Sequence, residues 1–291
     1  MLVGASLVVA VVLVVAVGMD RIMLDAFLGF LTLVAITLVA VPTLLWVARR
    51  EGEPAMARML VAAFSAKIVG TLLRYFVITV LYSDNADAGV YSGGGQFVAA
   101  NLRSGVLDFH IPQLAGRGSE TERIAQVVGV IYTVTGDSRY AGSFVFASLC
   151  FTGQVLMWRA FKRAVPEGDH HRYALLVLFL PSLLFWPSSI GKEALMLFCV
   201  GVVCYGAAQI FGDKVRTAGI VTFLLGAFGL FLIRPHMALI AIVALGVASA
   251  VSTVAGFRER SSMRIFAVRL LALVVLIGAA GAATSGLSSF F

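Results

Sequence analysis

Runs of apolar residues, each about as long as a lipid bilayer is thick, recur along almost the whole of this 291-residue chain. A helix needs about 20 such residues to cross a hydrocarbon core of about 30 Å. Nine runs reach or approach this length, and they cover roughly residues 2 to 18, 26 to 48, 59 to 82, 141 to 161, 173 to 190, 192 to 211, 217 to 233, 236 to 256 and 266 to 285. The sequence therefore predicts an all-α fold, a polytopic membrane helix bundle of about nine transmembrane helices.

The composition excludes the main alternatives to a membrane protein. Hydrophobic residues make up 60% of the chain and charged residues 13%, whereas a soluble domain is about half apolar and about a quarter charged. One water-soluble globule could not hide this much apolar sequence. A disordered chain, a collagen-like chain and a soluble enzyme are therefore excluded.

Basic residues between the apolar runs indicate how the chain crosses the membrane. Connections around residues 49 to 58, 159 to 172, 212 to 216 and 257 to 269 hold 13 of the 22 Lys and Arg residues. The positive-inside rule places these connections and the N-terminus in the cytoplasm, in a multi-pass protein of the cytoplasmic (inner) cell membrane. The same loops account for the net charge of +7, so no nucleic-acid partner is expected. A cleaved signal peptide ending near residues 16 to 18 is the alternative for the first run, although no Lys or Arg precedes it.

The longest connection, roughly residues 83 to 140, falls on the extracytoplasmic side by the same rule. It begins with Asp84 and Asp87, which we take as candidate catalytic residues. It continues with Tyr91, a candidate substrate-binding residue, and a glycine stretch, 93 to 95, that predicts flexibility. Two carboxylates three positions apart repel each other unless a cation, a proton or a hydrogen-bond donor compensates. Simple solvation at a helix end remains the alternative for both aspartates.

A surface helix is predicted in the second half of this connection. Residues 119 to 122 read Ser-Glu-Thr-Glu, the pattern of a helix capping box. The apolar residues that follow recur at the spacing of one helix face, and they are Ile124, Val127, Val128 and Ile131. Such a helix either lies at the bilayer surface or packs onto the spans as a lid.

Two predicted helix starts carry positive charge, and the first follows the fifth apolar run. Pro187 is expected to end one helix, and Ser188 or Ser189 to cap the next. Lys192 then falls in a first turn, where free N–H groups and the helix dipole favour an anion. Glu193, which follows it, either shares this site or only neutralises Lys192.

The second start is the sequence Arg234-Pro235-His236. Proline suits the first position of a helix, so Arg234 and His236 should lie beside its positive end. The predicted topology puts both starts on the side of the long connection. Together they could bind a phosphate head group beside a proton acceptor, whereas the alternative is that Lys192 and Arg234 only reach for lipid phosphates.

Two further cations, Lys67 and Arg74, lie within the third apolar run. A charged side chain at the bilayer centre costs at least about 2.5 kcal/mol, so both should face protein or a water-filled cavity. Their separation of seven positions places them on one helix face. Arg74 is nearer the extracytoplasmic end and is the candidate for the phosphate site.

The order of these features resembles a known family. A span, an acidic connection with Asp84, Asp87 and Tyr91, surface helices and six further spans resemble the seven-span module of GT-C-type glycosyltransferases, including the family-39-like enzymes. Residues 180 to 193 and 234 to 236 are also similar to segments of Wzy-like and EpsG-like polysaccharide polymerases.

The resemblance implies a division of the chain and an activity. It implies two N-terminal transmembrane helices over residues 1–58 and a seven-span module over 59–291. The activity would be extracytoplasmic transfer or polymerisation of sugars from a polyprenyl-phosphate-linked donor to a saccharide acceptor. It would serve cell-envelope or exopolysaccharide assembly.

The resemblance also implies roles for particular residues. Asp84 or Asp87 would deprotonate the acceptor hydroxyl. The carrier phosphate would be held by Lys192 and Arg234, with Arg74 and His236 assisting. A divalent metal is possible, but the sequence requires none, and no metal ligands are assigned.

The chain departs from the family pattern and leaves alternatives open. Its acidic pair is Asp-x-x-Asp rather than adjacent, and no soluble C-terminal domain is expected after the spans. The buried cations Lys67 and Arg74 would also suit a transporter or flippase for lipid-linked saccharides. A non-catalytic membrane subunit of a polysaccharide assembly complex is the third possibility.

Overall fold

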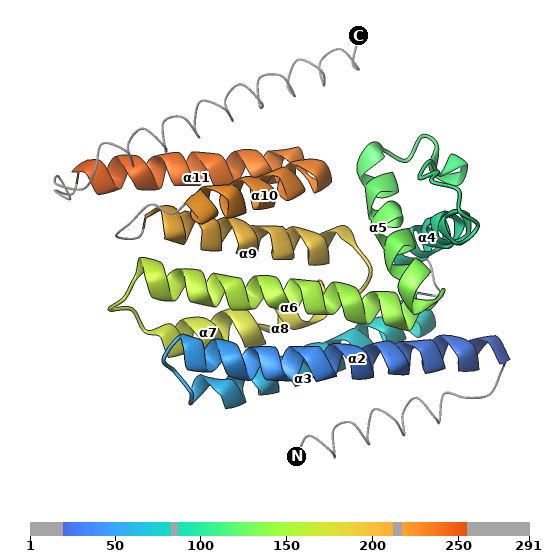
Figure 1. The fold of residues 1–291 in the computed structure, drawn as a ribbon, viewed down its shortest axis with the longest axis horizontal. Helices are drawn as coiled ribbons and strands as arrows, with labels where there is room; N and C mark the ends of the chain where they lie inside the picture. The colour runs from blue at the N-terminus through green and yellow to red at the C-terminus, as the bar shows by residue number, and fades with distance from the viewer. Residues whose placement is uncertain (1–19, 83–86, 212–216, 255–291) are drawn as a thin grey trace, which may run out of the picture. The chain divides into compact units, whose positions relative to one another are not determined.

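The computed structural model describes residues 20–82, 87–211 and 217–254, and every regular element in these ranges is a helix (Figure 1). The prediction of an all-α fold is confirmed. In chain order the elements are α2 (Asp20–Arg50), α3 (Met56–Phe76), η1 (Val77–Leu81), α4 (Asp87–Arg103), η2 (Pro112–Leu114), α5 (Ser119–Thr135), α6 (Arg139–Ala164), α7 (His170–Phe179), α8 (Pro181–Phe185), α9 (Lys192–Ile210), α10 (Thr217–Ile233) and α11 (Pro235–Val254).

Four helical stretches within the described ranges are long and apolar enough to cross a membrane. They are Met23–Arg50, Met56–Leu81, Arg139–Ala164 and Lys192–Ile210, while α10 and α11 are shorter apolar helices. These helices are compatible with the predicted membrane protein. The first and ninth predicted spans lie outside the described residues, so the count of nine and the orientation remain predictions.

The chain forms two compact units. The described residues within Met1–Val155 and His171–Phe198 make the first unit, and those within Leu156–His170 and Cys199–Phe291 make the second. Because α6 and α9 each contribute residues to both units, neither unit is a continuous piece of sequence. The division after residue 58 that the family resemblance implies remains a prediction.

In the first unit, hydrogen bonds and ring stacking join the start of α2, the end of α3 and the start of α6. Asp25 accepts a hydrogen bond from the Tyr75 hydroxyl at 3.2 Å and one from the Tyr140 amide at 3.5 Å. The rings of Tyr75 and Tyr140 stack with centroids 3.8 Å apart, and the Ser138 hydroxyl donates to the Asp25 carbonyl at 2.9 Å. We call this end of the unit, where α2 and α6 begin and α3 ends, the loop end.

Helices α4 and α5, which connect α3 to α6, cross each other closely (Figure 1). A side chain at Gly95 of α4 would meet Val128 at 2.4 Å, and one at Gly129 of α5 would meet Val98 at 2.5 Å. Residues 93 to 95 therefore lie inside a helix, and the prediction of a flexible glycine stretch is wrong. Gly95 and Gly129 are needed because a Cβ atom at either position would clash with a valine of the other helix, whereas one at Gly93 would meet nothing within 4 Å. Val98, Ile111, Leu114 and Ala125 form a buried core beside the crossing.

Helix α5 begins at Ser119, as the sequence predicts, but the predicted capping box is wrong. The cap position is Gly118, and no side chain caps it. Glu122 instead accepts hydrogen bonds from the Ile111 amide at 2.9 Å and from the His110 ring at 3.1 Å. The carboxylate thus ties the helix to the preceding loop.

The predicted apolar face of α5 divides between two environments. Ile124 and Val128 are buried beside α4, whereas Val127 is exposed and Ile131 is intermediate. The buried face includes residues that pack on α4. The two predicted alternatives, a helix at the bilayer surface and a lid on the spans, stay predictions. The second half of α5 carries apolar residues on more than one side.

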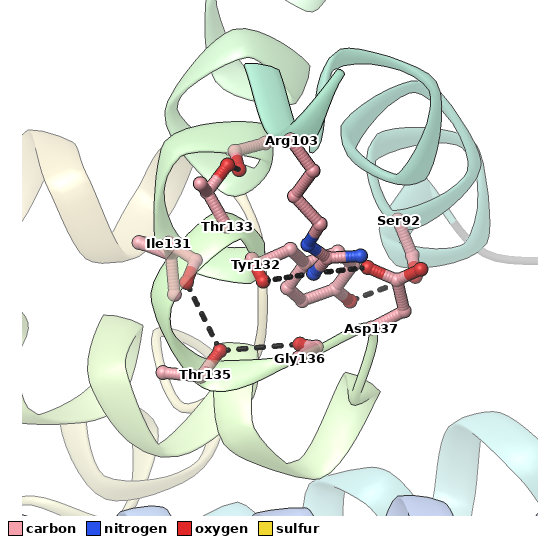
Figure 2. A network of polar contacts seen from close by, with 9 residues as sticks. Ser92, Arg103, Ile131, Tyr132, Thr133, Thr135, Gly136 and Asp137 are labelled. Carbon is pink, nitrogen blue, oxygen red and sulfur yellow. Dashed lines mark hydrogen bonds and ion pairs between the residues drawn. The ribbon is translucent and has the colours of Figure 1, made fainter. Parts of the chain in front are cut away.

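Figure 2 shows a network of polar contacts that ties the ends of α4 and α5 together. Arg103, the last residue of α4, donates to the Tyr132 carbonyl and forms an ion pair with Asp137 at 2.9 Å. The Tyr132 hydroxyl is 2.8 Å from the Ser92 hydroxyl. Burial raises the pKa of the Tyr132 phenol, because the charged phenolate would lose its hydration there.

In the second unit, α9 and α10 pack through glycine contacts. A side chain at Gly206 would meet the backbone of Phe223 at 2.4 Å, and one at Gly226 would meet Val203 at 2.8 Å. Near the end of α6, the guanidinium groups of Arg159 and Arg163 lie 4.8 and 4.7 Å from the ring centre of Tyr205. Cation–π contacts of this kind partly replace the water that these cations lose.

Candidate functional site

Arg74 is half-buried near the end of α3, on the loop-end side of that helix. Its guanidinium carbon lies 5.1 Å from the ring centre of Phe185 and 4.5 Å from that of Trp186. Both distances are within the range of a cation–π interaction. The Arg74 Nε atom is buried, and among the described residues it has no hydrogen-bond partner. Arg74 therefore retains one unused donor in a partly dehydrated setting.

The start of α9 lies within electrostatic range of this arginine. Lys192 is the first residue of α9 and is half-buried, and Glu193 is exposed and acts electrostatically on Arg74. A side chain at Gly191 would meet a Glu193 carboxylate oxygen at 3.1 Å, so this carboxylate lies beside the residue that precedes the helix. We call Arg74, Phe185, Trp186, Lys192 and Glu193 the Arg74 cluster.

The turn before α9 agrees with the sequence prediction only in part. Helix α8 ends at Phe185, before Pro187, and Lys192 occupies the first turn of α9, as predicted. The predicted capping by Ser188 or Ser189 is wrong, because α9 begins at Lys192 and neither serine directly precedes it. The Ser188 hydroxyl instead donates to the Leu184 carbonyl.

The cluster rests on an interrupted helix, α7 and α8, which replaces the continuous fifth span that the sequence predicts. The chain leaves the helical path at Leu180, next to Pro181. An interruption within a membrane leaves carbonyl groups that need other donors. Gln154 donates to the Val177 carbonyl at 2.6 Å, and Lys67 donates to the Leu183 carbonyl at 2.7 Å.

Lys67 is therefore a structural cation in this structure. It is fully buried, and its ammonium group also lies 3.2 Å from the Cys150 sulfur. Lys67 was predicted to face either protein or a water-filled cavity, and the structure confirms that it faces protein. Gly70, one turn later, lets α3 approach α8, since a side chain there would meet the Leu184 carbonyl at 2.3 Å.

The predicted acidic residues are only partly described. Asp84 lies outside the described residues. Asp87 is the first residue of α4 and is exposed, a position where a carboxylate interacts favourably with the helix dipole. Tyr91, one turn later, is buried within α4. The catalytic roles of Asp84 and Asp87 and the binding role of Tyr91 remain predictions.

The other predicted cations, Arg234 and His236, belong to the second unit. Helix α11 begins at Pro235, as predicted, with Arg234 directly before it and His236 in its first turn. Arg234 is half-buried and His236 is exposed. A pocket that these two residues share with the Arg74 cluster remains a prediction.

Sequence reasoning missed one carboxylate at the loop end, Asp25. It accepts hydrogen bonds from Tyr75, which directly follows Arg74, and from the backbone of Tyr140. The available signal was its place as a single acidic residue at the edge of the second apolar run. No group of three or more His, Cys, Asp or Glu residues within 20–82, 87–211 and 217–254 could hold a metal ion.

Comparisons with known proteins identify no relative. No protein-family model, no curated protein sequence and no solved structure matches the chain.

Proposed function

We propose that this chain is an integral membrane protein in which the Arg74 cluster binds the phosphate of a polyprenyl-phosphate-linked sugar. The observation that supports this most is Arg74 itself, a half-buried cation with an unused Nε donor beside the start of α9. A guanidinium and the N-terminus of a helix both favour phosphate oxygens. Phe185 and Trp186 lie within cation–π distance of the guanidinium.

The proposed reaction is transfer of the sugar to a saccharide hydroxyl on the extracytoplasmic side. The acceptor oxygen bonds to the anomeric carbon while the bond from that carbon to the phosphate oxygen breaks. The electron pair leaves with the phosphate, and the hydroxyl proton passes to Asp84 or Asp87. Fixed positive charge from Arg74 and Lys192 stabilises the phosphate as its charge grows.

Sugar transfer in reconstituted vesicles tests this proposal. A panel of polyprenyl-phosphate-linked sugars serves as donors, and Arg74→Gln is compared with Arg58→Gln. Arg58 is exposed near the opposite end of α3, so this control removes the same charge from the same helix. We expect Arg74→Gln to lower the transfer rate about 100-fold, as loss of a charge-stabilising donor does, and Arg58→Gln to leave it unchanged.

The proposed base is tested separately. The double variant Asp84→Asn/Asp87→Asn should lose sugar transfer but still bind the donor. Full transfer activity in this variant would remove both aspartates from the mechanism.

A transporter for lipid-linked saccharides is the second candidate, and the interrupted helix favours it. Interrupted helices often form the binding sites of transporters, and α7 and α8 are interrupted beside the buried Lys67. This candidate predicts movement of the saccharide across the vesicle membrane with no new glycosidic bond. Formation of such a bond by the purified protein in detergent would exclude transport as its only activity.

A further inference from the structure

Helix α5 presents an apolar face that does not pack on α4. Val127, Val130 and Val134 lie on one side of the helix and expose 38%, 50% and 86% of their surfaces. Their spacing of three and four positions places them one above another. The buried residues Ala125 and Val128 lie on another side, towards α4. We call Val127, Val130 and Val134 the valine face.

The last turn of α5 is fixed against a helix that is long and apolar enough to cross the membrane. A side chain at Gly136 would meet Leu28 of α2 at 2.7 Å, and the Ser138 hydroxyl bonds to the Asp25 carbonyl at 2.9 Å. The neighbouring side chains Leu24 and Phe27 of α2 are exposed and apolar. Since Met23–Arg50 is a candidate membrane span, Val134 lies at the level where that span begins.

The exposure of the valine face rises towards this level. It is smallest at Val127 and largest at Val134, two residues before the contact of Gly136 with α2. At the other end Arg123 lies on the same side of the helix, about 16 Å from Val134 along its axis. An apolar stripe that ends in a basic residue is typical of a helix at a lipid interface.

We infer that the valine face of α5 lies against the bilayer and extends the lipid-facing surface of α2. The partner is the lipid of the leaflet at the loop end. The crossed pair of α4 and α5 is then an interfacial element, held at the membrane by its own side chains as well as by its two connections. Charge contributes little to this contact, because the face itself contains only valines.

Spin labels at single cysteines in the protein reconstituted into phosphatidylcholine vesicles test this inference. The labelled variants are Val127→Cys, Val130→Cys and Val134→Cys, with Leu38→Cys of α2 as the lipid reference and Arg117→Cys as the water reference. Leu38 is exposed in the middle of α2, and Arg117 is exposed in the loop before α5. Labelled wild-type protein gives the background from Cys150, Cys199 and Cys204.

The accessibility of each label to oxygen and to a water-soluble nickel chelate is then compared. We expect the ratio to shift towards the Leu38 reference in the order 127, 130 and 134. Ratios equal to that of the Arg117 reference at all three positions would overturn the inference. Low accessibility to both reagents would also overturn it, because protein rather than lipid would then cover the face. The substituted valines are exposed, so cysteine leaves the packing of α4 on α5 intact.

Discussion

The crossing of α4 and α5 makes a strong prediction about two glycines that lie two positions apart. A Cβ atom at Gly95 would lie 2.4 Å from one Val128 carbon and 2.8 Å from another, whereas one at Gly93 would meet nothing within 4 Å. Carbon atoms pack best at about 3.5–4.0 Å, so Gly95→Ala must push the helices apart. Gly93→Ala is the matched control on the same helix.

The expected magnitude follows from two opposing effects. Overpacking costs about 1–3 kcal/mol, and replacing glycine by alanine within a helix gains about 0.5–1 kcal/mol. The helical gain is common to both variants, so their difference isolates the steric cost of about 1–3 kcal/mol. Gly93→Ala should itself be slightly stabilising.

Amide hydrogen exchange in detergent measures this difference locally. When the helices reclose faster than an open amide exchanges, the exchange rate follows the opening equilibrium, and each 1.4 kcal/mol changes that equilibrium tenfold. The amides of Val128 and Gly129 should therefore exchange about 5- to 150-fold faster in Gly95→Ala than in Gly93→Ala. Equal exchange in the two variants would refute the close crossing. The segment would then behave as the flexible connection that the glycine-rich sequence suggests.

Three further predictions concern the polar contacts of the first unit. Gln154→Met should lower the free energy of unfolding by about 1–3 kcal/mol, because the buried Val177 carbonyl loses its donor. Denaturation in detergent measures this free energy. The control Gln96→Met, on the exposed side of α4, should leave it unchanged. Arg103→Gln should speed exchange of the Gly136 amide more than Asp137→Asn does, because only the first variant also removes the bond to the Tyr132 carbonyl. The raised pKa of Tyr132 predicts that α4 and α5 lose stability above about pH 10, because the phenol ionises there in the unfolded chain but is held neutral in the fold. An ultraviolet titration of wild type against Tyr132→Phe checks this. The same pH dependence of the absorbance in both proteins would contradict it.

The helix starts could be predicted from the sequence because local signals determine them. Pro235 begins α11, Lys192 lies in the first turn of α9, and Ser119 begins α5, as their neighbouring residues indicate. Turn residues and proline act within a few positions, so the sequence alone carries this information. The all-helical class followed equally from the lengths of the apolar runs.

Features that depend on distant residues could not be predicted. The sequence predicts a flexible stretch at residues 93 to 95, but these residues lie inside α4, where Gly94 and Gly95 pack against α5. The sequence predicts a continuous fifth span, whereas the helix is interrupted between α7 and α8. Pro181 was the one local signal for this interruption. The donors that stabilise this interruption, Lys67 and Gln154, come from other helices.

The candidate site shows the same limit. The sequence predicted Arg74, Lys192 and Glu193 as candidate site residues. In the structure, Glu193 at the start of α9 lies within electrostatic range of Arg74. The sequence could not reveal that the rings of Phe185 and Trp186 would lie beside the guanidinium. Asp25 was missed because its bonds to Tyr75 and Tyr140 join three helices far apart in the chain.

Binding of polyprenyl phosphate to the purified protein tests the central claim most directly. Native mass spectrometry of wild type, Arg74→Gln and Arg58→Gln in the same detergent would give the bound fraction for each. The account predicts that wild type and Arg58→Gln bind the phosphate carrier equally and that Arg74→Gln loses it. Equal binding by all three proteins would contradict a phosphate site at the Arg74 cluster.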